Sequence, residues 1–287
     1  MREVIEQFLG HVADKRSSPN TVAAYRNDLT QFGAFLDGRV SGWTAVDQPL
    51  IVEYIAGIES TRGYASSTVA RKVAAIKSFF HYLAAEHVLP DDPTATLDSP
   101  RVHKQRPRAI SLDQVDRLLS QPDHADPTQG PRDRALLELL YATGLRVTEV
   151  VPLDVDDVVL DAAVVRTVRS RDGRERLVPI QSRAIVPLRE YLEHGRERLV
   201  RDPGEQALFL NHRGHRLTRQ GLWLIVKHYS RAVGIQEDVT PHTLRHTIAL
   251  HLLDQNADPV YVQRLLGYAS LTTTSIFRVA EGAAKAG

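Results

Sequence analysis

The sequence has 287 residues, of which 43% are hydrophobic and 25% are charged, a composition typical of a globular protein long enough to form two domains. The chain contains no cysteine, which excludes disulfides and thiolate zinc sites. No apolar stretch approaches the length that spans a bilayer, and no apolar run follows the first residues as it would in a signal peptide. We therefore expect a cytoplasmic protein without a membrane partner.

The formal net charge of +1 is unevenly distributed along the chain. Residues 1–100 carry 9 basic and 12 acidic side chains, whereas residues 101–287 carry 27 basic and 23 acidic ones. Only six of the 36 basic residues are lysine, and the planar guanidinium of arginine suits phosphate recognition. Codon bias gives the same enrichment, so the composition permits a nucleic-acid partner without demonstrating one.

The first part of the chain has the pattern of a helical domain, which we place at residues 1–90. Ser18 and Pro19 form a typical helix start, because serine caps a helix and proline suits its first turn. A second helix is predicted from about residue 66 to residue 85, with apolar side chains at helical spacing. Its other side is predicted to expose three cations that would follow a phosphate backbone, or simply form a solvated surface: Arg71, Lys72 and Lys77.

Residues 91–109 have the character of an interdomain linker. Prolines interrupt any periodicity there, and a basic run follows that includes Lys104, Arg106 and Arg108. A charged linker suits a protein that wraps a polyanion. The capping-box pattern from Ser111 to Gln114 then opens a second domain, which we place at residues 110–287.

The second domain is predicted to be mainly helical around a small antiparallel sheet, an α+β arrangement. Short β-prone runs lie at 155–159, 163–168 and 176–180, and a turn signal at 170–173 joins the last two as a hairpin. Helical patterns follow at about 182–199, 220–233, 241–254 and 259–266.

Two segments of this domain have the residue types of an anion site. In the first, Gly144 ends a hydrophobic helix, and Arg146 follows at the junction with the next helix. In the second, Thr240 starts a helix that places His242 in its first turn and Arg245 three residues later on the same side. A helix N-terminus with converging histidine and arginine is suited to bind a phosphate.

A metal site is a competing interpretation of the histidines. His242 and His246 are four residues apart on one predicted helix, with His251 further along it. Thr243, however, stands where a zinc protease has its glutamate. A metal-dependent helical hydrolase therefore remains an alternative hypothesis that requires bound metal, and the sequence itself predicts no metal site and no cofactor.

The two segments resemble the signature boxes of a known family. Residues 143–149 (TGLRVTE) and 241–246 (PHTLRH) resemble two boxes of the tyrosine recombinases, or phage integrases, especially of the Xer type. Residues 265–277 (LLGYASLTTTSIF) resemble the third box, and 174–180 (RERLVPI) the strand after the catalytic hairpin. Residues 18–25 (SPNTVAAY) resemble the helical, SAM-like core-binding domain. The resemblance spans nearly the whole chain, in the family's order.

The resemblance implies site-specific DNA recombination or integration. In the family, a tyrosine attacks a phosphodiester to form a 3′-phosphotyrosyl link and a free 5′-hydroxyl, with no metal or high-energy cofactor. By motif match, Arg146 and Arg245 stabilise charge on the phosphate oxygens. His242 assists proton transfer, and Glu149 supports these residues without contacting the phosphate itself.

Three positions depart from the family's pattern. Arg171 stands where the family has a lysine that protonates the leaving oxygen, and arginine is a poor acid. Tyr268 replaces a histidine or tryptophan and is expected to pack in the site and to keep a hydroxyl for a phosphate contact. Phe277 occupies the nucleophile position, where it lacks the attacking atom. We interpret it as an engineered block of cleavage, with a naturally inactive relative as the alternative.

The resemblance also implies partners. We expect a two-domain, C-shaped clamp around duplex DNA that carries a specific recombination site, and a homo-tetramer on synapsed DNA, associated with the nucleoid. The short tail at 280–287 is expected to weaken the coupling between subunits. A non-catalytic DNA-binding relative of the recombinases is the competing hypothesis, in which Arg171 and Phe277 are native losses.

Overall fold

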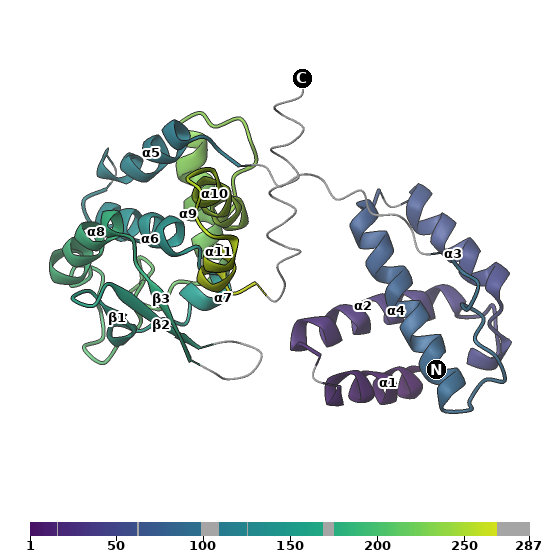
Figure 1. Ribbon diagram of the computed structural model, residues 1–287. Coiled ribbons are helices and arrows are strands. Elements are labelled where there is room, and N and C mark those ends of the chain that lie inside the picture. Colours follow the sequence, from purple (N-terminus) through teal and green to yellow (C-terminus); the bar gives the residue numbers. More distant parts are fainter. Residues whose placement is uncertain (16, 62, 99–108, 125, 169–174, 269–287) are drawn as a thin grey trace, which may run out of the picture. The chain divides into compact units, whose positions relative to one another are not determined.

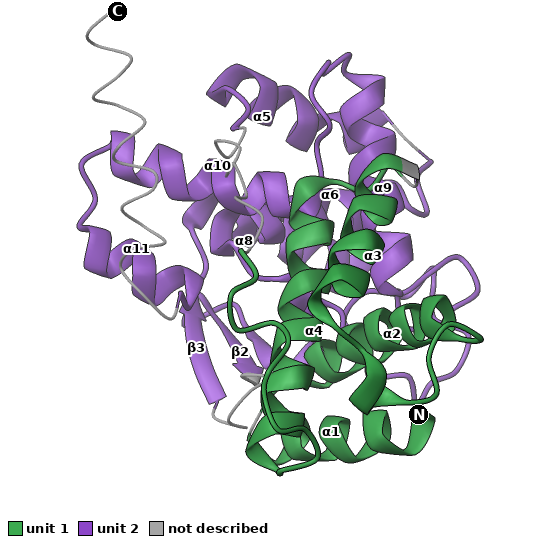
Figure 2. Cartoon of the chain, turned by 90° about the vertical axis from the view of Figure 1, so that its right-hand side faces the viewer, with its two compact units in different colours: residues 1–105 green, residues 106–287 purple. Residues whose placement is uncertain are grey.

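The computed structural model describes all residues except 16, 62, 99–108, 125, 169–174 and 269–287 (Figure 1). The chain divides into two compact units, Met1–Gln105 and Arg106–Gly287 (Figure 2). Each unit has its own hydrophobic core. Among the helices of the described residues, none is long and apolar enough to cross a membrane.

The first unit is helical, as predicted. Its helices are α1 (Arg2–Asp14), α2 (Pro19–Leu36), α3 (Gln48–Thr61) and α4 (Ser66–Ala85). The hydroxyl of Ser18 accepts a hydrogen bond from the Thr21 amide at 3.1 Å, which confirms the predicted start of α2. The helices pack around a cluster of aromatic side chains that includes Phe8, Phe32, Trp43, Phe79 and Phe80.

The basic face predicted for α4 is wrong at Lys72. This side chain is only 2% exposed, and its ammonium donates to Asp28 Oδ1 at 3.0 Å and to Gln31 Oε1 at 2.9 Å. Residue 72 lies three positions after Val69 and four before Ile76, which places it on the buried face of the helix. A lysine there needs a carboxylate, and Asp28 on α2 supplies it.

The two neighbouring cations of α4 are more accessible. Arg71 pairs with the same Asp28 carboxylate while its side chain stays 40% exposed. Lys77 is partly buried, and its ammonium donates to the Leu97 carbonyl at 2.6 Å. Of the three predicted DNA-binding residues of α4, Arg71 thus combines a side chain that is 40% exposed with a position that an ion pair with Asp28 fixes.

Helix α6 (Gly130–Thr143) forms the centre of the second unit, and every side chain from residue 135 to residue 145 is buried. Around it lie α5 (Leu112–Ser120), α7 (Val147–Val150), α8 (Ile185–Glu190), α9 (Arg219–Ala232), α10 (Pro241–Asp254) and α11 (Pro259–Leu266). The predicted capping box before α5 is present, because Ser111 and Gln114 exchange side-chain to backbone hydrogen bonds.

The sheet has three antiparallel strands in the order β1 (Val158–Val159), β2 (Val164–Val168) and β3 (Glu175–Pro179). The predicted pairing of the last two strands is confirmed, with Val165 opposite Val178 and Thr167 opposite Arg176. The first strand is shorter than predicted, because residues 155–157 form a 3₁₀ turn in which Asp157 caps the Asp154 amide. A mainly helical α+β unit is therefore confirmed.

The helix predicted from 182 to 199 is wrong in its last part. Helix α8 continues into a single π-helical turn, Tyr191–Gly195, and stops. A side chain at Gly195 would lie 2.9 Å from Pro131 Cβ, so the chain passes close to the start of α6 at this point. The next residue, Arg196, turns away and donates to the carbonyls of Glu205 and Ala207.

Candidate active site

Arg146 lies at the junction of two helices, as the sequence predicted. Helix α6 ends at Gly144, whose φ of 58° is in the left-handed region that glycine adopts without strain. An added Cβ there would overlap the side chain of Leu266 at the end of α11. Arg146 is the N-cap of α7, and its backbone amide donates to Glu149 Oε2 at 2.7 Å. Its Nη2 donates to the Gly267 carbonyl at 3.1 Å, and the side chain stays 40% exposed.

Arg245 is buried on the inner side of α10. Thr240 caps this helix by accepting from the Thr243 amide at 3.1 Å, which confirms the predicted helix start. The Arg245 side chain is 2% exposed and donates through Nη1 to the Gly144 carbonyl and through Nη2 to the Leu266 carbonyl. Its guanidinium carbon lies 4.9 Å from the centre of the Tyr268 ring.

Burial and the neighbouring charge of Arg146 lower the pKa of Arg245 to about 10. A group with that pKa is still a cation at neutral pH. Tyr268 packs against this cation as predicted. Its hydroxyl is buried, and the predicted phosphate contact of that hydroxyl stays a prediction.

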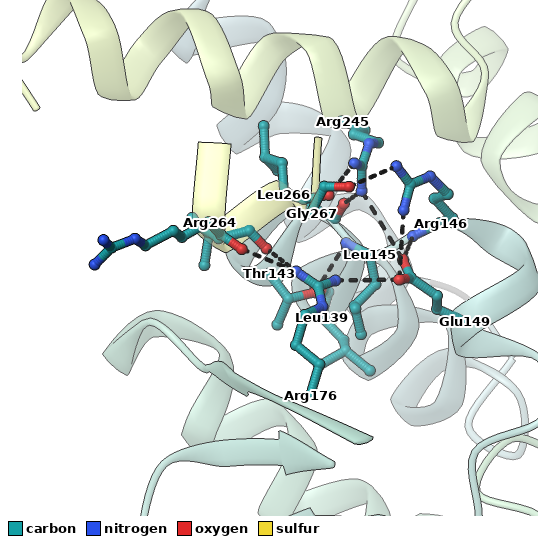
Figure 3. A network of polar contacts seen from close by, with 12 residues as sticks. Leu139, Thr143, Leu145, Arg146, Glu149, Arg176, Arg245, Arg264, Leu266 and Gly267 are labelled. Carbon is teal, nitrogen blue, oxygen red and sulfur yellow. Dashed lines mark hydrogen bonds and ion pairs between the residues drawn. The ribbon is translucent and has the colours of Figure 1, made fainter. Parts of the chain in front are cut away.

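Glu149 is the carboxylate on which the arginines converge (Figure 3). Its side chain is 6% exposed, and its oxygens lie 3.1 Å from Arg176 Nη2, 3.5 Å from Arg146 Nη1 and 4.0 Å from Arg245 Nη1. One carboxylate thus faces three guanidinium groups. The cluster keeps an excess of positive charge, which favours an anion as a further partner.

The histidines of α10 are held in the neutral form. Burial lowers the pKa of His242, and the positive charges of Arg245 and Arg146 lower it further. Burial likewise lowers the pKa of His246 to about 4, with contributions from His242 and Arg245. The two rings lie edge to face, with their centroids 4.9 Å apart. Neighbouring residues desolvate part of the His242 ring, but the residue as a whole is exposed at the first turn of the helix. In its neutral form it is able to accept a proton.

The alternative metal site lacks a converging ligand set in the described part of the chain. His251 is engaged elsewhere, since its Nδ1 is 2.8 Å from the hydroxyl of Tyr141. Nowhere among the described residues do three histidine, aspartate or glutamate side chains come together in an arrangement that could hold a metal ion.

The structure thus brings five of the predicted site residues into one region of the second unit: Arg146, Glu149, His242, Arg245 and Tyr268. Arg71, Lys72 and Lys77 belong to the first unit. The remaining predicted site residues, Lys104, Arg106, Arg108, Arg171 and Phe277, lie outside the described residues.

Arg176 is a member of the site that sequence reasoning missed. It lies on β3 with a side chain that is 9% exposed, and it donates to Glu149 at 3.1 Å and to the Leu265 carbonyl at 2.5 Å. Strand alternation offered a signal, because residue 176 shares a strand face with the buried Val178 and Ile180. An arginine on the inward face of a strand requires a buried partner.

Two family descriptions match the chain. The phage integrase family matches residues 108–281, and the phage integrase N-terminal SAM-like domain matches residues 5–87. The tyrosine recombinase XerC of Roseiflexus castenholzii is 48% identical over 281 residues, which cover 96% of this chain and 88% of the relative. The tyrosine recombinase XerD of Listeria innocua is 40% identical over 281 residues, covering 96% of this chain and 94% of the relative.

Solved structures share the fold. The XerH site-specific recombinase bound to a palindromic difH substrate, in a post-cleavage complex, aligns with a TM-score of 0.77 at 21% identity and covers 98% of this chain and 94% of its own. The XerA recombinase aligns with a TM-score of 0.53 at 26% identity, covering 96% of this chain and 92% of its own.

Proposed function

The chain belongs to the phage integrase family of tyrosine recombinases, and from this premise we propose that its site is built to cut and rejoin DNA through a 3′-phosphotyrosyl intermediate. The observation that carries the proposal is the cluster of Arg146, Arg176 and Arg245 around the single carboxylate of Glu149. Three members of this cluster, Arg146, Glu149 and Arg245, come from the two boxes that suggested the family.

The two recombinase-box arginines retain hydrogen-bond capacity for a phosphate. A guanidinium has five N–H donors. Among the described residues, Arg245 uses one at each Nη for the carbonyls of Gly144 and Leu266, so it keeps further donors. Arg146 uses Nη2 for the Gly267 carbonyl and pairs with Glu149 through Nη1, and its side chain is 40% exposed. Attack on a phosphodiester increases the negative charge on its nonbridging oxygens, and fixed cationic donors stabilise that charge.

The proposed proton transfers follow from the charge states in the site. The attacking tyrosine oxygen forms a bond to phosphorus, and its proton goes to His242, which is neutral because burial and two nearby arginines lower its pKa. The bond between phosphorus and the 5′-oxygen breaks, and that oxygen takes up a proton from a water molecule. We assign Arg171 to stabilising charge on the leaving oxygen, because a guanidinium holds its proton too tightly to be a good proton donor. Glu149 holds the arginines and does not touch the phosphate.

Phe277 determines whether this chain can cleave DNA. A phenylalanine ring has no atom that can attack phosphorus, so we propose that this chain binds its DNA without cleaving it. A non-catalytic DNA-binding relative of the recombinases is the second candidate, and the same residue favours it.

We propose duplex DNA with a specific recombination site as the partner, bound as a homo-tetramer on synapsed DNA in the cytoplasm and on the nucleoid. Arg71 supports a DNA contact by the first unit, since Asp28 fixes its guanidinium while the side chain as a whole remains 40% exposed. Lys77, Lys104, Arg106 and Arg108 complete the proposed set of phosphate contacts. Lys72 is not part of that set, because its ammonium already donates to Asp28 and Gln31 and lies over the Tyr64 ring.

Covalent trapping tests the proposal. The Phe277→Tyr variant is incubated with nicked duplexes that carry candidate recombination sites, and a denaturation-resistant protein–DNA band is sought. We expect a band that disappears when Arg146→Ala or Arg245→Ala is added, and that persists with Arg189→Ala, an exposed arginine of α8. Tight and specific DNA binding without any band would support the non-catalytic candidate instead.

A further inference from the structure

We propose that Arg176 is a positioning residue of the active site, which holds the two phosphate-binding arginines through Glu149 and through the end of α11. The inference rests on the proposed function, because it assigns the phosphate to Arg146 and Arg245. Arg176 itself is engaged on both sides and touches no substrate in this scheme.

Four consecutive carbonyls at the end of α11 are each bound by an arginine of the cluster. Arg176 Nη1 donates to the carbonyls of Arg264 and Leu265, at 3.2 and 2.5 Å. Arg245 donates to the next carbonyl, that of Leu266, and Arg146 to the following one, that of Gly267. The last carbonyls of a helix lack partners within it and carry the negative end of its dipole, so they attract cations. This row of carbonyls sets the spacing of the three guanidinium groups (Figure 3).

Glu149 links the same arginines from the opposite side. Arg176 Nη2 lies 3.1 Å from Oε1 of Glu149, closer than the Nη1 atoms of Arg146 and Arg245 at 3.5 and 4.0 Å. A buried carboxylate that loses its nearest cation pairs more strongly with the cations that remain. Without Arg176, Glu149 would therefore draw Arg146 and Arg245 away from the phosphate.

The backbone at Gly267 makes room for this arrangement. Its φ is +61°, and an added Cβ would lie 3.1 Å from Arg176 Nη1 and 3.2 Å from its Cζ. The flat guanidinium thus packs directly against the residue that ends α11. A lysine offers one ammonium in place of the planar fork and is not expected to reach two carbonyls and a carboxylate together.

The first test measures cleavage in the Phe277→Tyr background, with single-turnover rates at saturating protein and DNA affinity determined separately. We expect Arg176→Ala to lower the rate by about 10- to 100-fold, the size expected for displaced catalytic groups, with DNA affinity unchanged within about threefold. Arg176→Lys is expected to recover little of the rate. Arg166→Ala removes an exposed arginine from the neighbouring strand and is expected to behave like the parent.

A double variant separates positioning from general destabilisation. If Arg176 acts by occupying Glu149, then adding Glu149→Gln to Arg176→Ala costs less than the product of the two single losses. A multiplicative double loss, or a rate loss explained by weaker DNA binding, would overturn the inference.

Hydrogen exchange provides a readout that does not depend on cleavage. In the Phe277 chain, Arg176→Ala is expected to speed exchange of the Gly267 and Tyr268 amides, which donate to the carbonyls of Arg264 and Gln263, and to leave α9 unchanged. If the Phe277→Tyr variant forms no covalent DNA adduct but Arg176→Ala speeds exchange of these two amides, the proposed function fails and the anchoring by Arg176 stands. If adduct forms and Arg176→Ala matches Arg166→Ala in both rate and exchange, the inference on Arg176 fails and the proposed function stands.

Discussion

Asp28 in the first unit and Glu149 in the second are both buried carboxylates held by cationic side chains, but the type and number of their partners differ. Asp28 pairs with Lys72, which is 2% exposed, and with Arg71. Glu149 is surrounded by three arginines, each of which also donates to backbone carbonyls. The first cluster joins α2 to α4, whereas the second joins α7, α10 and β3 to the end of α11.

The difference shows how the type of cation decides whether a buried charge can also serve a ligand. An ammonium has three donors. Lys72 gives two of them to Asp28 and Gln31, and its Nζ lies 5.1 Å from the centre of the Tyr64 ring. A guanidinium has five donors in a rigid fork, so Arg245, which is fixed by two carbonyls, keeps donors for the phosphate contact that we propose.

The largest expected effect is that of Asp28→Ala on the stability of the first unit. The substitution leaves the Lys72 ammonium buried without its carboxylate, and we expect the free energy of unfolding to fall by about 3 to 5 kcal/mol. Urea unfolding measures this loss in a Trp223→Phe background. Trp43, in the core of the first unit, is then the only remaining tryptophan, so its fluorescence follows the unfolding of that unit.

Adding Lys72→Met to Asp28→Ala is the matched control. With neither charge buried, we expect at least half of the lost stability to return. A double variant as unstable as Asp28→Ala alone would show that the cost arises from packing around α2, and the comparison of the two clusters would then have no electrostatic basis.

Much of the fold could be predicted from local sequence, because the residues that start and stop the helices act on their own backbone. Ser18, Ser111 and Thr240 cap the helices that they were predicted to start, and Gly144 ends α6 in the left-handed conformation. The end of α8 was not predictable in this way. At its end the chain passes close to Pro131, which is distant in sequence, and a local pattern does not show such a neighbour.

Only those residues of the site that belong to a recognisable motif could be predicted from the sequence. The boxes identified Arg146, Glu149, His242 and Arg245, whereas Arg176 owes its place to contacts with α11, about 88 residues further along the chain. The error at Lys72 has a similar origin, since its charge suggested exposure while its helical position indicated burial. In both cases the partner that accepts the charge is distant in sequence, and the pattern around the residue gives only its face.

An intermediate effect is expected from pH, and it concerns the second unit. An unfolded histidine titrates near 6.5, whereas burial, His242 and Arg245 lower the pKa of His246 in the folded state to about 4. Between these pH values the unfolded chain binds more protons, so the stability contributed by neutral His246 is fully present above pH 6.5 and is lost as the pH falls toward 4. We expect the loss to be about 1 to 3 kcal/mol.

The measurement compares urea unfolding of the parent chain with that of His246→Gln across this range of pH. The glutamine does not titrate, so the parent is expected to lose more stability than the variant on acidification. Equal losses in the two proteins would assign the acid sensitivity of the second unit to other groups, such as the carboxylates.

The smallest expected effect distinguishes the two cations that share Asp28. If the exposed Arg71 contacts a phosphate, then Arg71→Ala reduces the slope of log affinity against log salt concentration by about 0.9, because one fewer counterion is released from the DNA. Lys72→Met is expected to leave that slope unchanged, since its ammonium is 2% exposed and already bound to Asp28 and Gln31. Fluorescence anisotropy with non-specific duplex DNA at several salt concentrations gives both slopes. A reduced slope with Lys72→Met would mean that α4 rearranges on DNA to release its buried lysine, whereas an unchanged slope with Arg71→Ala would leave Asp28 and both of its cations with a structural role alone.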